Sequence, residues 1–579
     1  MAVDLNRRGL LRALGAAALG SAGAGVGLLT SRGIKPNTTQ RILHPQRIVT
    51  SNDGLFVDFG KAWFGNIAIT PDDDNKQRSV VIRMGEKLAD DGKIDRAPFG
   101  SVRYYEVETV LSGTYSPPLT PADIRGMPLG RPAMPFRYLE IDGWRGSPNP
   151  GAILLEAVVA NEAMTTGRIR FTGNSETARK FNRLMELGEH TMEATSFMGV
   201  FIDGDRERIP YEADGLINQL GWYATTGDWK VPRRTIEALL RQPSWPSEWM
   251  VQLIFMVWED YLATGDKAFL RSIYAQLKTF SLEKFIDHTG LVTTVQKKLA
   301  AEFVRETGAD YLEDIVDWPP GERDGYEMCS YNTVVNCFVC AGLQVMGTIA
   351  ERIGRGQEAV RFATSAAQLR TAIHRNLISE RSGLFIDGLG SNHSAAHSTF
   401  VPLAFNLVPS ERIGDALAHL KSRIASHHGG FPCSVYGAQY LLQALFRYGE
   451  GKAALELMLN DSERGWMHML DAYDATVTHE AWDVRYKDNI DWNHAWGAAF
   501  VSIAQRFILG ARMLEPRWTR WTLSPPADIG EPIDATVPTP NGLIHVSVDA
   551  ARREITVRPV NAATFVPSTP SGEWTISIR

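Results

Sequence analysis

The sequence predicts a multidomain protein with an N-terminal β-sandwich, a central (α/α)6 barrel and a C-terminal β-domain. The chain has 579 residues, too many for one hydrophobic core. Short β-branched and aromatic runs fill residues 40–174 and return in 513–579, whereas residues 175–512 repeat apolar positions at three- and four-residue steps. The composition, 44% hydrophobic and 22% charged, is that of an ordinary globular protein.

Residues 1–39 have the form of an export signal and linker. Arg7 and Arg8 precede a weakly apolar stretch rich in glycine and alanine, which is typical of a twin-arginine signal. A stretch this rich in glycine and broken by Arg12 is a poor membrane anchor. We therefore expect a periplasmic or secreted protein with no membrane span after signal processing. Retention as an uncleaved tether is the alternative.

Residues 40–174 are expected to form the β-sandwich. The strand-like runs are "LFVDFGKAWFGNIAIT", "SVVIRMGEKL", "SVRYYEVETVL", "FRYLEIDGW" and "AILLEAVVANE", separated by Asp, Gly and Pro turns. The Pro-rich piece "YSPPLTPADIRGMPLGRPAMPF" is expected to be a loop inside this domain, because strand-like sequence resumes directly after it.

Residues 175–512 contain about a dozen amphipathic segments, for which a ring of helical hairpins is the economical arrangement. Cys337 and Cys340 form a CxxC inside one apolar helical run. Since no second Cys or His pair stands at ligand spacing, buried free thiols are favoured over a metal or redox site. Residues 513–579 return to strands, "LIHVSVD", "EITVRPV" and "EWTISIR", and are expected to form a small β-domain.

Charge and aromatic content narrow the classes of partner. The formal net charge is −6 and no block of Lys and Arg is present, so nucleic acid is not an expected partner. The chain has 15 tryptophans, many of them beside Asp, Glu or His in the middle of the chain. Tryptophans in such places line sugar sites, although buried packing is their commoner use.

The densest charge run is "DGDRERIPYEAD", from Asp203 to Asp214. Pro210 fits the first turn of a helix beginning near Tyr211, so electrostatics at a helix start would explain Glu212 and Asp214. That explanation does not cover the charged residues that precede the helix, Asp203, Asp205, Arg206 and Glu207.

Two further acidic loops interrupt the helical region. In "EDIVDWPPGERDGYE", two prolines fix a loop that holds Asp317 beside Trp318, which offers a carboxylate for sugar hydroxyls and an indole for stacking; a surface turn is the alternative. The run "DATVTHEAWDVRYKDNIDWNHAWG" contains Glu480 and Trp482 and leads into a helix. The acids and aromatics that precede this helix are Asp491, Trp492, His494 and Trp496.

Two carboxyl groups on opposite sides of a sugar are what the cleavage of a glycosidic bond needs, one giving a proton to the leaving oxygen and one activating water or attacking the sugar. Glu207 and Glu480 are more than 270 residues apart. They would meet only if the helices close into a ring, whose loops converge at one rim.

The quoted motifs, with "DWPPGERDGY", "WMHMLDAYDATVTHEAWD" and "DWNHAWGAAF", resemble the catalytic domain of the glycoside hydrolase family 78 α-L-rhamnosidases. The pieces "VDFGKAWFGNIAI" and "IRMGEKLADDGKID" resemble the β-domain that precedes it. The resemblance runs from roughly residue 50 to 540. It implies a six-hairpin glycosidase that hydrolyses terminal α-L-rhamnosyl residues, with inversion, from a plant or algal polysaccharide or glycoside.

Carried over residue by residue, the resemblance makes Glu207 the general acid and Glu480 the general base, without metal or cofactor. The residues expected to bind the sugar are Asp203, Arg206, Tyr211, Asp214, Trp249, Asp317, Trp318, Trp482 and His494. The stretch "IPYEA" departs from the family pattern and places Tyr211 where many members have tryptophan.

Two other functions stay open at this point. The same barrel class hosts polysaccharide lyases and unsaturated-uronyl hydrolases, which would act on uronates. A non-catalytic glycan-binding protein, in which the tryptophans bind and the acids are vestigial, is the other alternative.

Overall fold

The computed structural model describes residues 37–124, 127–559, 564–565 and 574–578, which all lie within one compact unit, Lys35–Arg579. The twin-arginine stretch lies outside the described residues.

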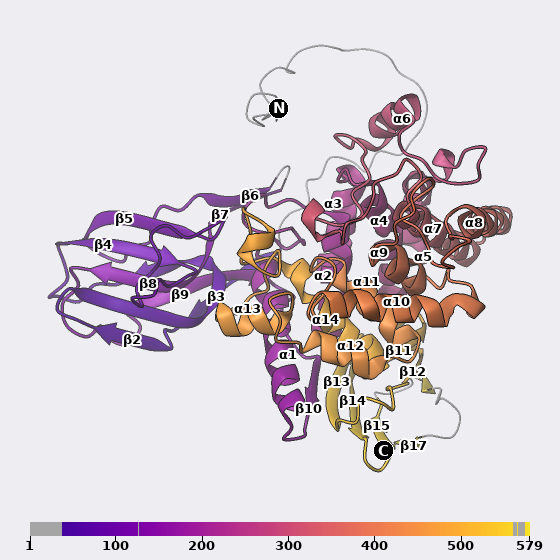
Figure 1. Cartoon of the computed structure of the whole chain (residues 1–579). Coiled ribbons are helices and arrows are strands. Elements are labelled where there is room, and N and C mark those ends of the chain that lie inside the picture. The colour runs from indigo at the N-terminus through magenta and orange to yellow at the C-terminus, as the bar shows by residue number, and fades with distance from the viewer. Residues whose placement is uncertain (1–36, 125–126, 560–563, 566–573, 579) are drawn as a thin grey trace. The chain divides into compact units, whose positions relative to one another are not determined.

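The N-terminal domain is built on a seven-stranded antiparallel sheet in the order β1-β9-β3-β8-β4-β5, with β2 paired to β3 (Figure 1). Its strands are β1 (Thr38–Leu43), β2 (Arg47–Thr50), β3 (Gly54–Ile69), β4 (Arg78–Gly85), β5 (Tyr104–Leu111), β8 (Met134–Asp142) and β9 (Ile153–Ala160). The predicted sandwich is confirmed. The Pro-rich piece, expected to be a loop, instead contains a short antiparallel pair, β6 (Pro121–Ile124) and β7 (Met127–Pro132). Its prolines 121 and 132 face each other at the outer ends of the two strands, where a missing N–H costs little.

Fourteen α-helices occupy the centre of the described chain. They are α1 (Glu176–Ala194), α2 (Glu212–Thr225), α3 (Lys230–Arg241), α4 (Ser247–Thr264), α5 (Lys267–Leu277), α6 (Lys297–Thr307), α7 (Thr333–Arg352), α8 (Gly356–Asn376), α9 (His397–Ala404), α10 (Ile413–Ser426), α11 (Ala438–Arg447), α12 (Gly451–Met458), α13 (Trp466–Ala472) and α14 (Ala499–Ile503).

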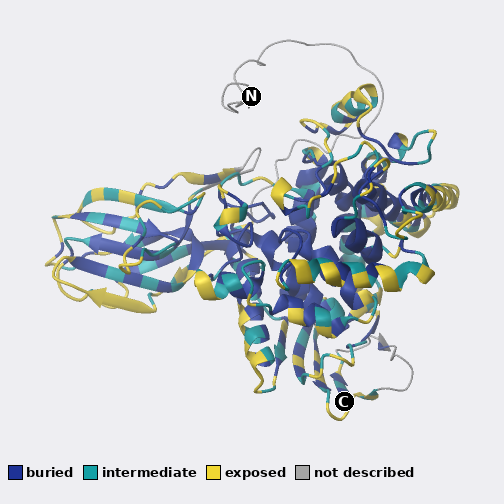
Figure 2. Cartoon of the chain, in the orientation of Figure 1, coloured by how far each residue is buried: buried dark blue, intermediate teal, exposed yellow. Residues whose placement is uncertain are grey.

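Six of these helices close a ring. α2 packs on α4, α4 on α7, α7 on α9, α9 on α11, α11 on α14, and α14 again on α2. Outer helices such as α1, α3, α8 and α10 pack against this ring. Figure 2 shows the difference in burial: α2 and α4 are largely buried, whereas α8 and α10 expose one side. The predicted (α/α)6 barrel is confirmed.

A C-terminal sheet closes the chain. It has the order β10-β13-β14-β15-β17, formed by β10 (Arg168–Phe171), β13 (Ile533–Thr539), β14 (Gly542–Asp549), β15 (Glu554–Arg558) and β17 (Thr575–Ile578). β11 (Arg512–Glu515), β12 (Arg520–Thr522) and β16 (Thr564–Phe565) form a smaller sheet. β10 precedes the barrel in sequence but pairs with β13, so residues 168–171 belong to the C-terminal sheet.

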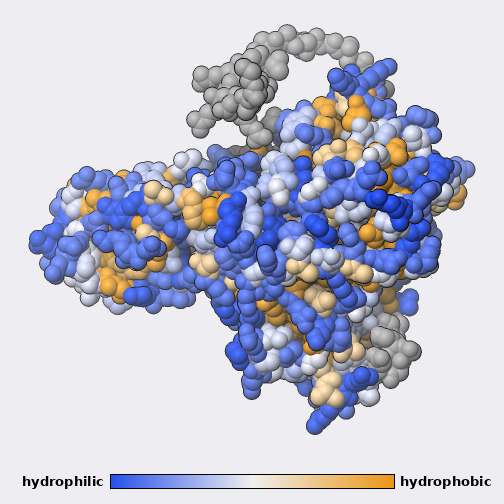
Figure 3. Space-filling view, viewed as in Figure 1, coloured by the Kyte–Doolittle hydropathy of each residue, from blue (hydrophilic) through white to orange (hydrophobic). Residues whose placement is uncertain are grey.

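Apolar segments lie mainly inside the protein, and Figure 3 shows a largely hydrophilic surface with small hydrophobic patches on the visible face. Among the described helices, α7 alone is long and apolar enough to cross a membrane, and 83% of its apolar window is buried within the fold. Cys337 and Cys340 lie in this helix, and both are free and buried, as expected.

Candidate active site

The charged run before α2 folds into a tight loop. The Asp203 amide donates to the Ile209 carbonyl at 2.9 Å, and Asp203 Oδ1 accepts the Ile209 N–H at 2.9 Å. Arg206 and Glu207 lie between these closing contacts. The sequence predicted Pro210 in the first turn of this helix. That prediction is wrong by one or two residues, because Tyr211 is the N-cap of α2 and Pro210 lies just before the helix.

The N-terminal domain and the segment formed by residues 491–493 contact this loop. Asp205 is buried and forms ion pairs with Arg103, which precedes β5, and with Arg208. Its amide donates to Asn493 Oδ1 at 2.8 Å. Gly204 faces the same segment, where an added Cβ would stand 2.7 Å from Asp491 Oδ2. Ion pairs to Asp205 and the hydrogen bond to Asn493 therefore fix the position of the loop.

Arg206 joins the two acidic loops. Its Nη1 and Nη2 donate to the two carboxylate oxygens of Glu480 at 2.7 and 2.8 Å, and Nη1 also donates to the Asn489 carbonyl at 2.6 Å. A bidentate arginine–carboxylate pair fixes both position and orientation. The loops that carry Glu207 and Glu480 are thus in contact across the ring, through Arg206, the residue before Glu207.

Glu480 is 2% exposed and surrounded by donors. The Asp491 N–H donates to Glu480 Oε2 at 3.1 Å, and Lys487 Nζ lies 3.4 Å from Oε1. Burial alone would raise the pKa of Glu480, but the hydrogen bonds from Arg206 and the nearby cations outweigh it, and the pKa lies below its ordinary value. Glu480 is an ionised carboxylate in a largely dry environment.

Glu207 is more accessible, because its side chain is 28% exposed. Its Oε2 accepts a hydrogen bond from Tyr211 OH at 2.8 Å, and its Oε1 lies 3.7 Å from Arg206 Nε. One guanidinium therefore separates the carboxyl of Glu207 from that of Glu480. Both carboxyl groups therefore belong to one site, as the cleavage of a glycosidic bond requires.

Three further carboxyl groups around this pair favour the protonated form. Burial, with the charges of Glu207 and Asp214, raises the pKa of Asp203 well above its ordinary value. Burial, with the charge of Glu480, raises the pKa of Asp214 likewise and that of Asp491 to about 7. Negative charge is therefore disfavoured around the accessible Glu207, apart from Glu480, which is held ionised by its cations.

Several buried polar atoms around the two carboxyl groups have no hydrogen-bond partner among the residues that the structure describes. They are Arg206 Nε, Asp214 Oδ1, Trp249 Nε1, Asp491 Oδ1 and His494 Nδ1. His494 lies 3.5 Å from Asp214 and 4.0 Å from Glu480, and burial lowers its pKa to about 3, so its ring is neutral. Buried polar groups usually have partners. These donors and acceptors are suited to a ligand with many hydroxyl groups.

Aromatic rings lie beside the carboxyl groups. Trp249, at the start of α4, packs edge-on against Tyr211 with ring centroids 5.9 Å apart and against Trp496 at 6.0 Å. The Trp496 indole N–H donates to the Glu480 carbonyl at 3.0 Å, and Tyr436 stacks on Trp496. Apolar ring surface is therefore available next to the polar cluster.

Trp318 approaches from another loop. Its ring lies 5.7 Å from Lys487 Nζ, the cation beside Glu480. Asp317 is fully buried and accepts hydrogen bonds from Trp318 N–H, His397 and Ser434. Because protein donors surround this carboxylate, it is not part of a surface turn, and it orients the backbone of Trp318.

Trp482 has its ring packed inside the protein. It is fully buried, stacks on Phe431 with centroids 4.7 Å apart, and donates to the Cys433 carbonyl at 2.7 Å. Its neighbour Trp466 packs edge-on at 5.2 Å. This indole therefore belongs to the packing beneath the Glu480 loop.

Comparison with known proteins assigns the two large domains. Residues 170–507 match the bacterial α-L-rhamnosidase six-hairpin glycosidase domain, and residues 49–160 match the bacterial α-L-rhamnosidase concanavalin-like domain. The chain belongs to the bacterial α-L-rhamnosidase family. It is thus a glycoside hydrolase family 78 protein by its domain composition.

Individual relatives of this family are distant. An α-L-rhamnosidase of Alteromonas sp. (strain LOR) is 22% identical over 341 residues, which cover 56% of this chain and 35% of the relative. The solved rhamnosidase of Bacillus sp. GL1 has a TM-score of 0.69 at 18% identity, covering 93% of this chain and 55% of its own. The α-L-rhamnosidase of Streptomyces avermitilis, complexed with L-rhamnose, has a TM-score of 0.67 at 15% identity, covering 88% and 48%. The chain spans about a third to about half the length of these relatives.

Two residues at the candidate site were not among the residues expected from the sequence. Lys487 is 7% exposed and contacts both Glu480 and Trp318. Asp491 is fully buried against the loop of Arg206. Asp491 stood within a quoted acidic run, but the only sequence signal for Lys487 is a single lysine in a loop rich in Trp and Asp.

Proposed function

We propose that the chain hydrolyses terminal α-L-rhamnosyl residues with inversion, using Glu207 as general acid and Glu480 as general base. The observation that carries the proposal is the guanidinium of Arg206, which binds Glu480 bidentately and lies 3.7 Å from Glu207 in the six-hairpin domain of this family. The rhamnose bound to the Streptomyces avermitilis relative supports the choice of sugar.

In this mechanism Glu207 donates its proton to the leaving glycosidic oxygen. Its exposed fraction of 28% lets a substrate reach it, and Tyr211 OH fixes the orientation of its carboxyl. The buried acids Asp203 and Asp214 have raised pKa values, so their own neutral forms are favoured.

Glu480 takes a proton from the attacking water. Arg206 and Lys487 keep it ionised, so it is ready to accept that proton. The neutral His494 and the unpartnered Asp214 Oδ1 are positioned to hydrogen-bond sugar hydroxyls, and Trp249 supplies an apolar face for the methyl group of a deoxysugar.

A panel of aryl glycosides tests the proposal. We expect release of the aryl group from the α-L-rhamnoside and strongly reduced release after Glu207→Gln or Glu480→Gln. If both variants kept the rate of the unmodified protein, the assignment of the two carboxyl groups would be wrong. Rising ultraviolet absorbance on polyuronates would instead indicate a lyase, and tight sugar binding without turnover a glycan-binding protein.

We also propose export by the twin-arginine route, supported by Arg7 and Arg8 before the Gly- and Ala-rich stretch. The natural substrate would then be a plant or algal polysaccharide or glycoside outside the cytoplasm. Replacing both arginines with lysine should keep the protein in the cytoplasm of a producing cell, and unchanged export would contradict this route.

A further inference from the structure

The barrel has a pocket formed largely by the C-terminal halves of its inner helices. It has a volume of about 390 Å³ and is lined from five of the six inner helices. On α2 the lining begins at Leu216 and Leu220, whereas Glu212 and Asp214 at the opposite end of this helix adjoin the candidate active site. Since a helix rises about 1.5 Å per residue, Leu220 lies about 12 Å along the axis from Glu212.

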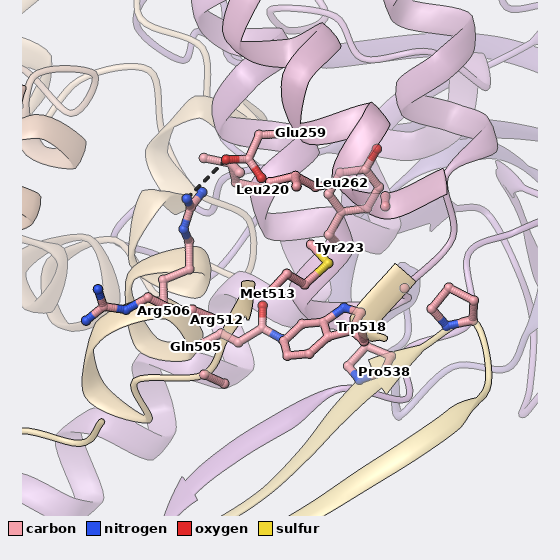
Figure 4. A pocket seen from close by; sticks show the side chains of 14 residues that line it. Leu220, Tyr223, Glu259, Leu262, Gln505, Arg506, Arg512, Met513, Trp518 and Pro538 are labelled. Atoms are coloured by element: carbon pink, nitrogen blue, oxygen red, sulfur yellow. Dashed lines mark ion pairs between the residues drawn. The ribbon is translucent and has the colours of Figure 1, made fainter. Parts of the chain in front are cut away.

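Arginine dominates the charge of this pocket. Arg370, Arg447 and Arg506 line it, and Arg506 also lines a neighbouring pocket of about 150 Å³ together with Arg512. Among the described residues, Glu259 is the one carboxylate that lines either pocket. It pairs with Arg506 at 3.0 Å, the dashed contact in Figure 4.

Three of these arginines lack a carboxylate partner. Among the described residues, no carboxylate oxygen lies within 4.0 Å of Arg370, Arg447 or Arg512. Burial and the charge of Arg506 lower the pKa of Arg447 and Arg512. Three arginines and one glutamate line the larger pocket, so its lining carries excess positive charge.

The pocket also offers a hydrogen-bond acceptor and apolar faces. Gln439 is 4% exposed and lines the pocket, and its Oε1 has no hydrogen-bond partner within the described part of the chain. Trp258, Phe255 and Tyr440 supply aromatic surface. An acceptor in this position needs a donor on the ligand, and aromatic faces suit the C–H surface of a ring. A bare inorganic anion uses neither feature.

We infer that this pocket binds an acidic sugar, with the carboxylate of a uronic acid at Arg447 and Arg506 and its hydroxyl groups at Gln439. A volume of about 390 Å³ is within the usual range of small-molecule sites. This site is separate from the proposed hydrolytic site and does not depend on the sugar cleaved there.

Calorimetric titration of the full chain with D-galacturonate and D-glucuronate tests the inference. We expect millimolar binding that weakens as NaCl is added, and at least tenfold weaker binding of neutral D-galactose. Arg447→Gln with Arg506→Gln removes both proposed contacts of the carboxylate, and circular dichroism would check that this double variant folds. The double variant should bind uronate at least fivefold more weakly.

Arg381 provides the matched control. It is exposed, lines neither pocket, and forms no ion pair among the described residues, so Arg381→Gln should bind uronate like the unmodified protein. The inference is wrong if the double variant binds uronate as tightly as the unmodified protein, or if D-galactose binds as tightly as the uronates. Tighter binding of inorganic phosphate than of uronate would overturn the assignment to a sugar.

Discussion

Replacing Arg206 with glutamine separates two roles that this side chain could have. The sequence placed Arg206 on the sugar, whereas the structure places both Nη atoms on Glu480. Hydrogen bonds from Arg206 help to lower the pKa of Glu480 against the effect of burial, so Arg206→Gln should raise that pKa. A general base acts when ionised. The acid limb of the pH profile should therefore move to higher pH.

The size of this shift follows from the contact that is lost. A hydrogen bond to a charged group contributes about 1.5–3 kcal/mol, and one pKa unit corresponds to about 1.4 kcal/mol. The Glu480 side chain is 3% exposed and the Arg206 side chain 20%, so solvent screens the pair weakly. We expect the acid limb to move up by about one to two pH units.

The assay is kcat/KM for an aryl α-L-rhamnoside measured from about pH 4 to 9. Arg233→Gln is the matched control, because Arg233 on α3 makes a similarly buried pair with Asp260 on α4 at 2.6 Å. This variant should leave the acid limb in place. A uniform loss of rate in Arg206→Gln, with the acid limb unmoved, would refute the reasoning and return Arg206 to the sugar.

Three further predictions concern the same region. Glu207→Gln should lower kcat by about 10²–10⁴ on a substrate with a poor leaving group and less on a nitrophenyl glycoside; equal losses on both would argue against an acid role. Gly204→Ala should destabilise the protein by about 1–3 kcal/mol in urea and reduce activity, because the new Cβ would stand 2.7 Å from Asp491 Oδ2; unchanged values would contradict this packing. Burial raises the pKa of Glu212 to about 7, so its contribution to stability is full below the ordinary carboxyl pKa and is lost as pH rises through 7. Glu212→Gln should therefore flatten the pH dependence of the unfolding free energy between pH 5 and 8 by up to about 3 kcal/mol. An unchanged slope would exclude Glu212 as its source.

The domain order was predictable because each domain repeats one period over many residues. The switch from alternating strands to three- and four-residue steps near residue 175 marks the start of the barrel. The pairing of β10 with β13 could not be predicted from position in the sequence, since the two strands are more than 360 residues apart. The Pro-rich hairpin was missed because proline disfavours strands except at their ends and edges.

The site was predictable where the chemistry lies within one run of sequence. Asp203, Glu207 and Tyr211 share a single loop, and a charge run without helical spacing marks them. The link between Arg206 and Glu480 spans 274 residues and depends on ring closure, which no local pattern encodes. For the same reason, the residues beside Trp482 in the sequence do not predict that it is buried in the core.

The stereochemistry of the first product tests the central claim most directly. Proton NMR during hydrolysis of an aryl α-L-rhamnoside should show β-L-rhamnose first, with the α-anomer appearing only as mutarotation proceeds, because Glu207 and Glu480 act as a separate acid and base. Immediate formation of α-L-rhamnose would mean that a carboxylate attacks the sugar and the outcome is retention, and it would contradict the roles assigned to the two residues.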